Sequence, residues 1–271
     1  MRPRTLQQLT GWVVTAGMLW AAGVMPSNAM PGAAGDLQRE VEQRLEREAS
    51  IGALVRTHTL EVVVRDAEVI LKGSVSTLWE KEWAVERARD TAGVTSVISE
   101  LRVVEPESDA VLVTAVRQTI ARYPHYTVFD YVTGRIANAV VTLRGEVMPQ
   151  QDKTGDLYKL VSRVPGVREI VIDIDVLSPG IGDERIRSAL MRSLFGNVAF
   201  DRYRGINPGL HIIVRNGYVW LKGSVYDEAD KILAEIIARQ TFGVIRVENE
   251  LKTRHELEET ARHFRNVGVG D

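Results

Sequence analysis

The feature that most constrains the fold is a short segment that occurs three times. Residues 69–75 read VILKGSV, residues 140–147 read VVTLRGEV and residues 219–225 read VWLKGSV. Each copy contains leucine, a basic residue, glycine and, two positions later, valine. The repeat distance of roughly 70 to 80 residues is too long for one turn of a solenoid and suits a small domain. The sequence therefore predicts a tandem array of one small module.

The third copy shows most clearly how a module begins. Ile186, Leu190 and Leu194 recur at the spacing of one helix face, so an amphipathic helix is predicted there. An alternating strand follows after a variable loop. The dipeptide Asn216-Gly217 then favours a type I′ hairpin turn, because both residues tolerate positive φ. The module therefore starts with a helix and a β-hairpin.

The second half of the module is a helix and a last strand. Ala234 and Ala238 lie one turn apart on the predicted second helix and should face the sheet. Gly243 is expected to end this helix in a left-handed conformation. The other copies lack the ideal turn, with RDA at residues 65–67 and IANA at residues 136–139. The order is α-β-β-α-β, and a right-handed crossover places the third strand parallel to the second.

These observations predict the α+β class. The chain is expected to contain three tandem α-β-β-α-β modules, each a small mixed three-stranded sheet covered by two helices. The expected divisions are residues 36–105, 109–178 and 183–254, with a helical or flexible tail at 255–271. Six glycines serve as backbone devices at the end of the second strand or after the second helix of each module, namely Gly73, Gly145, Gly223, Gly93, Gly166 and Gly243.

The N-terminus has the layout of a secretory signal. Arg2 and Arg4 precede an apolar core at residues 11–25, and a proline and a small-x-small site follow. A core of about 15 residues is shorter than the roughly 20 that a membrane span needs. We predict that residues 1–29 are a signal peptide, cleaved to leave a periplasmic chain that starts at Met30. Retention of the segment as an anchor is the alternative.

Composition argues against several classes of function. The net charge of −2 is unlike that of a strongly basic nucleic-acid binder, and no cysteine is present to supply a thiolate metal site or nucleophile. The five histidines have no acidic partner at metal-ligand spacing, and no nucleotide or hydrolase motif occurs. We therefore expect no catalytic residues, metal, cofactor or nucleic-acid partner.

The module resembles the BON family (bacterial OsmY and nodulation). The resemblance rests on the first helix, the hairpin with its Leu-x-Gly-x-Val motif, the second helix and the Gly-Val before the last strand. The second copy departs from this pattern at residues 152–156, which lower helix propensity. The resemblance implies a non-enzymatic periplasmic protein that binds anionic phospholipid surfaces and supports envelope integrity or osmotic-stress tolerance. The alternative function is a protein–protein interaction or chaperone-like module without direct lipid binding.

A basic segment in the third copy is the first candidate binding site. Residues 185–215 contain six arginines and a single acid, Asp201, with Phe195, Phe200 and Tyr203 among them. Basic side chains beside exposed aromatic ones suit an anionic lipid surface. The alternative is a solvated arginine face over phenylalanines that belong to the core. The candidate residues are Arg185, Arg187, Arg192, Arg202 and Arg204, with Arg215 at the end of the segment.

Two tryptophans in the first copy are the second candidate. Trp79 and Trp83 lie one turn apart on the predicted second helix, where Ala84 and Ala88 should face the sheet. Tryptophan in such a position can bind a partner, sit at a membrane interface or pack between modules. Packing between modules is the simpler interpretation.

Overall fold

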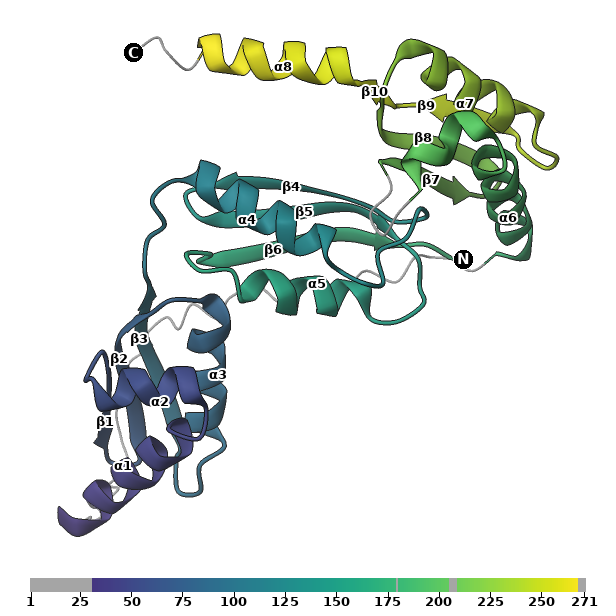
Figure 1. Ribbon diagram of the computed structural model, residues 1–271. Helices are drawn as coiled ribbons and strands as arrows, with labels where there is room; N and C mark the ends of the chain where they lie inside the picture. The colour runs from purple at the N-terminus through teal and green to yellow at the C-terminus, as the bar shows by residue number, and fades with distance from the viewer. Residues whose placement is uncertain (1–30, 179, 205–208, 268–271) are drawn as a thin grey trace, which may run out of the picture.

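The computed structural model describes residues 31–178, 180–204 and 209–267, which form three α+β units in succession (Figure 1). The predicted signal peptide at residues 1–29 lies outside these residues. The first unit consists of α1 (Pro31–Leu45), α2 (Ala49–Arg56), β1 (Leu60–Arg65), β2 (Glu68–Val75), α3 (Leu78–Arg89) and β3 (Ser96–Val103). The second consists of α4 (Asp109–Ala121), β4 (Tyr131–Ala137), β5 (Val140–Val147), α5 (Lys153–Ser162) and β6 (Glu169–Val176).

The third unit has the same order with additions. It consists of α6 (Ile181–Phe195), the 3-10 helix η1 (Val198–Tyr203), β7 (Leu210–Arg215), β8 (Tyr218–Val225), α7 (Glu228–Gln240), β9 (Arg246–Asn249) and β10 (Lys252–Thr253), and α8 (Arg254–Val267) follows it. In each unit the second strand is central, antiparallel to the first and parallel to the last. The expected mixed three-stranded sheets with helices are confirmed.

Two details differ from the expected order. The loop before the hairpin contains the extra helix α2 in the first unit and η1 in the third. The last strand of the third unit is divided into β9 and β10, both parallel to β8. The division occurs where Glu250 donates its N–H to the carbonyl of Leu221. Neither the added helices nor the division of the last strand changes the direction of any strand.

The repeated glycines occupy equivalent positions, as predicted. Gly73, Gly145 and Gly223 each pair with the first strand, and all three have positive φ. A Cβ at Gly73 would lie 1.9 Å from the carbonyl oxygen of Thr59. The motif therefore needs glycine because the backbone of the preceding loop approaches too closely for a side chain. The second strand runs on for two residues beyond each glycine.

All three hairpin turns adopt left-handed conformations, although only the third has the ideal sequence. Both central turn residues have positive φ in each unit. In the third unit the carboxylate of Asp183 accepts the backbone N–H groups of Asn216 and Gly217, each at 2.8 Å. Asp109 makes the same contacts with the turn of the second unit. A carboxylate on the first helix thus stabilises the turn in the second and third units, including the Asn138-Ala139 turn, where alanine does not favour positive φ.

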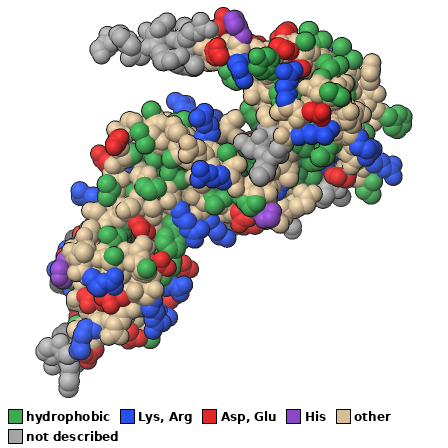
Figure 2. All heavy atoms as spheres, in the orientation of Figure 1, with side chains coloured by type: hydrophobic (Ala, Val, Ile, Leu, Met, Phe, Trp, Pro, Cys, Tyr) green, Lys and Arg blue, Asp and Glu red, His purple; other side chains and the backbone are tan. Residues whose placement is uncertain are grey.

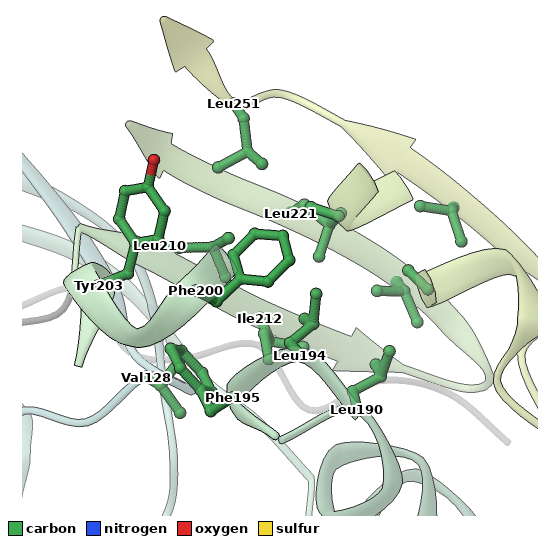
Figure 3. Close-up of a cluster of buried hydrophobic side chains, with 14 of the residues drawn as sticks. Val128, Leu190, Leu194, Phe195, Phe200, Tyr203, Leu210, Ile212, Leu221 and Leu251 are labelled. Carbon is green, nitrogen blue, oxygen red and sulfur yellow. The ribbon is translucent and has the colours of Figure 1, made fainter. Parts of the chain in front are cut away.

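The core of the third unit lies between its helices and its sheet (Figure 3). Ala234 and Ala238 are fully buried against the sheet, as their spacing predicts, and so are Ala84 and Ala88 in the first unit. Val128, which belongs to the loop before β4 of the second unit, is part of this core and lies beside Phe195 in Figure 3. The second and third units therefore share apolar packing.

The second unit also covers the open sheet face of the third. Ile213 of β7 is buried against Met148 and Leu177. Beside this contact, Lys222 of β8 forms an ion pair of 2.9 Å with Glu146 of β5. The face of β7 and β8 that carries no helix is thus partly occupied within the chain.

Helix α8 is attached to the third unit through its first turn. Thr253 and Glu256 form reciprocal side-chain to backbone hydrogen bonds of 2.6 and 3.2 Å. Lys231 of α7 forms an ion pair of 3.2 Å with Glu256. The hydrogen bond from the Thr253 N–H and the contact with Lys231 lower the pKa of Glu256 to about 2. This carboxylate therefore joins α8 to α7.

Replacing Glu256 by glutamine should increase the rate of amide hydrogen exchange in α8 at pH 6. Because the folded-state pKa lies below the ordinary value, the stabilisation is complete above about pH 4.5 and is lost as the pH falls toward 2. Exchange in wild-type α8 should therefore approach that of the variant at pH 3, after correction for the intrinsic exchange rate. Glu259→Gln on the same helix is the control. Equal protection of the wild type and Glu256→Gln at pH 6 would contradict the role of Glu256.

Candidate functional site

In the folded chain the arginines of residues 185–215 fall into three groups: one is buried, some pair with carboxylates, and some are exposed cations. Arg187 is fully buried. Its guanidinium donates to the carbonyl of Val214 at 2.8 Å and contacts Glu184 at 3.3 Å. A side chain in this position cannot reach a lipid headgroup. The prediction that Arg187 is a surface residue is therefore wrong, and its role is to join α6 to β7.

Three of the other arginines are neutralised by carboxylates. Arg202 forms an ion pair of 2.7 Å with Asp230, and its guanidinium lies 5.1 Å from the ring centre of Tyr226. Arg204 pairs with Asp201 at 3.1 Å. Arg215 pairs at 3.1 Å with Asp175 of the second unit. The positive charge of the linear segment is therefore much reduced in the folded chain.

The aromatic residues of the segment are buried. Phe200 is fully buried, and Phe195 and Tyr203 are each 9% exposed. The hydroxyl of Tyr203 donates to Asp230 and accepts the N–H of Tyr226 at 2.6 Å. Burial, and then the hydrogen bond to Asp230, raise the pKa of Tyr203 to about 12. The expectation of exposed aromatic side chains is wrong, and the alternative of core phenylalanines is confirmed for Phe195 and Phe200.

Arg185 and Arg192 remain as exposed cations on α6. They are seven residues apart, so they lie on the same face of the helix, about 10 Å apart along its axis. Among the described residues, neither forms an ion pair. Both line a hollow of about 570 Å³ beside Met148 and Ile181. These two arginines are the part of the predicted site that the structure brings together at the surface.

Arg192 also borders a larger apolar groove between the second and third units. The groove has a volume of about 870 Å³. Half-exposed Met191 is one of its lining residues, and Arg204 lies at its edge with Arg192. The remaining lining residues are Thr127, Val128, Phe129, Phe195, Gly196 and Tyr203. An apolar groove with guanidinium groups at its edge can accept an anionic group joined to an apolar one.

A buried ion pair holds the groove wall that the second unit contributes. Lys153 and Asp130 are 3% and 0% exposed, and their charged atoms are 2.6 Å apart. Asp130 also accepts the N–H of Thr127 and of Met148, each at 2.7 Å. The carbonyl of Val128 then accepts the N–H of Ile212 in β7 at 2.7 Å. The loop that carries the wall is thus fixed to both units.

No sequence pattern marks this groove wall or the ion pair that supports it. Val128 and Phe129 lie in the variable loop of the second copy, where no motif marks them. Asp130 and Lys153 are 23 residues apart, so no helix or strand spacing relates them. Asp152, in the segment that lowers helix propensity, accepts the N–H of Gly155 and caps the N-terminus of α5.

The structure places Trp79 and Trp83 beside the second unit. Both rings are partly buried, and the guanidinium of Arg163 lies 5.0 Å from the ring centre of Trp79. The hydroxyl of Tyr158 donates to Glu82 next to them. The tryptophans therefore lie where α3 meets α5, and the arginine surface on α6 belongs to a different unit.

In residues 31–178, 180–204 and 209–267 there is no cluster of three His, Asp or Glu side chains that could hold a metal ion. No helix of that part is long and apolar enough to cross a membrane.

Comparison with known families gives two matches along the chain. The BON domain model matches residues 33–105 and residues 182–255, which together are more than half of the chain. The second unit lies between the matched regions. No catalytic family is indicated. A comparison with curated proteins found no match in sequence.

Among solved structures, the chain is similar to the C-terminal domain of CdsD, the structural protein of the type III secretion system of Chlamydia trachomatis. The identity is 12%, the TM-score is 0.24, and the match covers 80% of this chain and 97% of that one. A putative arginine deiminase from Porphyromonas gingivalis matches at 14% identity and a TM-score of 0.13, with 71% and 50% of the two chains covered. At these TM-scores neither structure informs the function.

Proposed function

The chain belongs to the BON domain family, and we propose that it is a non-enzymatic periplasmic protein that binds anionic phospholipid surfaces through α6 of its third unit. BON domains are associated with phospholipid binding in envelope and osmotic-stress proteins. The observation that carries the proposal is the pair of free arginines, Arg185 and Arg192, on one face of α6 beside an apolar groove. The second unit is a third BON-like module in this proposal, because it repeats the order and register of the other two.

The chemistry of the surface fits a peripheral contact with lipid. Each unpaired guanidinium near anionic headgroups contributes about 1 kcal/mol. The half-exposed side chain of Met191 and the groove beside it offer apolar contacts at the level of the acyl chains. The attraction is local, because physiological salt screens charges beyond about 8 Å. An overall charge of −2 is therefore compatible with binding.

The test is flotation of residues 30–271, which retain every described element, with anionic and zwitterionic vesicles. Replacing Arg185 and Arg192 by glutamine should weaken binding to anionic vesicles by about 2 kcal/mol, roughly 30-fold. The matched control is Arg65→Gln with Arg89→Gln, which changes the net charge equally on exposed arginines of the first unit. Trp79→Ala with Trp83→Ala should have the smaller effect.

Binding that is indifferent to salt and to lipid charge would contradict the proposal. An equal loss in the control pair would show that net charge, and not the α6 surface, controls binding. If the tryptophan pair had the larger effect, the alternative function of a protein–protein or chaperone-like module would be favoured.

A further inference from the structure

Helix α7 is apolar on two opposite faces. Ala234 and Ala238 face the sheet and are fully buried. Ile232 and Ile236 lie one turn apart, about 200° around the axis from these alanines, and are 52% and 45% exposed. A helix that is hydrophobic all round is usually buried on all sides. The outer face of α7 therefore has the composition of a covered surface.

The exposed apolar surface continues past the end of α7. Phe242 is 97% exposed and Ile245 is 69% exposed, and both lie in the turn that leads to β9. We call Ile232, Ile236, Phe242 and Ile245 the α7 ridge. Figure 2 shows hydrophobic side chains among charged ones over this part of the third unit. Exposed apolar side chains gathered on one part of a surface often mark interaction sites.

The other two units show that the fold does not require these residues. When the units are aligned on their repeated glycines, none of the ridge positions carries a large aliphatic or aromatic residue in the other two units. The residues there are Glu82, Glu86, Ala92 and Thr95 in the first unit and Gly155, Lys159, Pro165 and Arg168 in the second. The ridge is thus a property of the third unit and not of the module.

The chain itself shows how such surfaces are used. The second helices of the first and second units, α3 and α5, pack against each other. The carbonyl of Ser76, just before α3, accepts the N–H of Gly166, just after α5, at 3.0 Å. The elements on which α7 mainly packs, α6, β8, β9 and β10, all belong to its own unit. The position that mediates docking between modules is therefore free in the third unit.

The charges around the ridge favour protein over an anionic membrane. Arg239 pairs with Glu235 at 2.8 Å, and Arg246 pairs with Glu248 at 3.3 Å. Lys231 is engaged by Glu256. The helix itself carries three acidic and two basic residues, with acids at its start and Arg239 near its end. Asp230 is buried and paired with Arg202. These ion pairs leave little net charge on the outer face of α7, so two copies of that face can approach without strong like-charge repulsion.

We propose that the α7 ridge is the docking surface for a second copy of this chain, with α7 packed against α7 of the partner around a two-fold axis. A two-fold interface uses the same patch on both copies, so one self-complementary ridge is sufficient. The proposal concerns a surface distinct from Arg185 and Arg192, and it does not depend on lipid binding.

The test replaces ridge residues of the third unit by the residues found at the same positions of the first unit. Ile232→Glu, Ile236→Glu and Phe242→Ala introduce the residues that occupy these positions in the first unit, where the module folds with them. Sedimentation velocity of residues 30–271 should show a concentration-dependent dimer over about 1 to 100 μM, the range in which small interfaces dissociate. The triple variant should remain monomeric. Val198→Thr, at a residue 82% exposed outside the ridge, should dimerise like the wild type.

A wild-type chain that is monomeric throughout this range would overturn the proposal, and so would a triple variant that still dimerises. If the wild type were monomeric and the triple variant lost binding to vesicles, the ridge would be a membrane contact instead. Circular dichroism spectra that agree between the variants and the wild type show that a lost dimer does not reflect unfolding.

Discussion

Replacing Lys153 by methionine is expected to destabilise the second unit by about 3 to 5 kcal/mol, the usual loss when one member of a buried ion pair is removed. Methionine retains the apolar stem of lysine, but the carboxylate of Asp130 stays at 0% exposure without its cation. Amide hydrogen exchange in β4, β5 and α5 measures the effect locally. A local measurement is preferable because a chain of several units need not unfold in one step.

Two further variants separate the charge from the change in side-chain shape. Lys159→Met alters an exposed lysine on the same helix and should leave exchange nearly unchanged. Adding Asp130→Asn to Lys153→Met should restore part of the protection, because a neutral amide needs no cation. If Lys153→Met exchanged like Lys159→Met, the pair would not be what holds the loop at residues 127–130.

Much of the fold could be predicted because the same close backbone approach, which only glycine tolerates, recurs in all three units. Glycine is needed because the backbone at the start of the first strand, or just before it, approaches the second strand too closely for a side chain in every unit. The buried alanines of α3 and α7 follow from helix spacing in the same way. The helix α2 and the break between β9 and β10 could not be predicted, because they occur in single copies and have no repeated signal.

The candidate site was less predictable because its charges combine only in the folded chain. Asp230, which neutralises Arg202, is 28 residues away in sequence. Asp175, which neutralises Arg215, is 40 residues away and belongs to another unit. A count of charges along one segment contains neither acid. The sequence identified the correct helix, and the fold determines that Arg185 and Arg192 are its free cations.

Arg187 and Arg192 belong to the same helix and look alike in the sequence, but they should differ in their effect on stability. Arg187→Ala is expected to destabilise the third unit by about 3 kcal/mol or more, because it leaves a cavity and removes a donor from a buried carbonyl. β7 is an edge strand, and its outward backbone groups need partners beyond the sheet. Val128 accepts from Ile212, and Arg187 donates to Val214. Without Arg187, the buried carbonyl of Val214 therefore has no hydrogen-bond donor.

Arg192→Ala is the matched control, since it removes an exposed guanidinium from the same helix and should change stability by less than about 0.5 kcal/mol. Amide exchange in β7 and β8 should rise strongly in Arg187→Ala and stay at the wild-type level in Arg192→Ala. In a vesicle-binding assay, Arg192→Ala should bind anionic lipid more weakly than the wild type although its third unit remains folded. An Arg187→Ala chain with native exchange in β7 would mean that solvent or another side chain satisfies Val214, and Arg187 would then have no structural role.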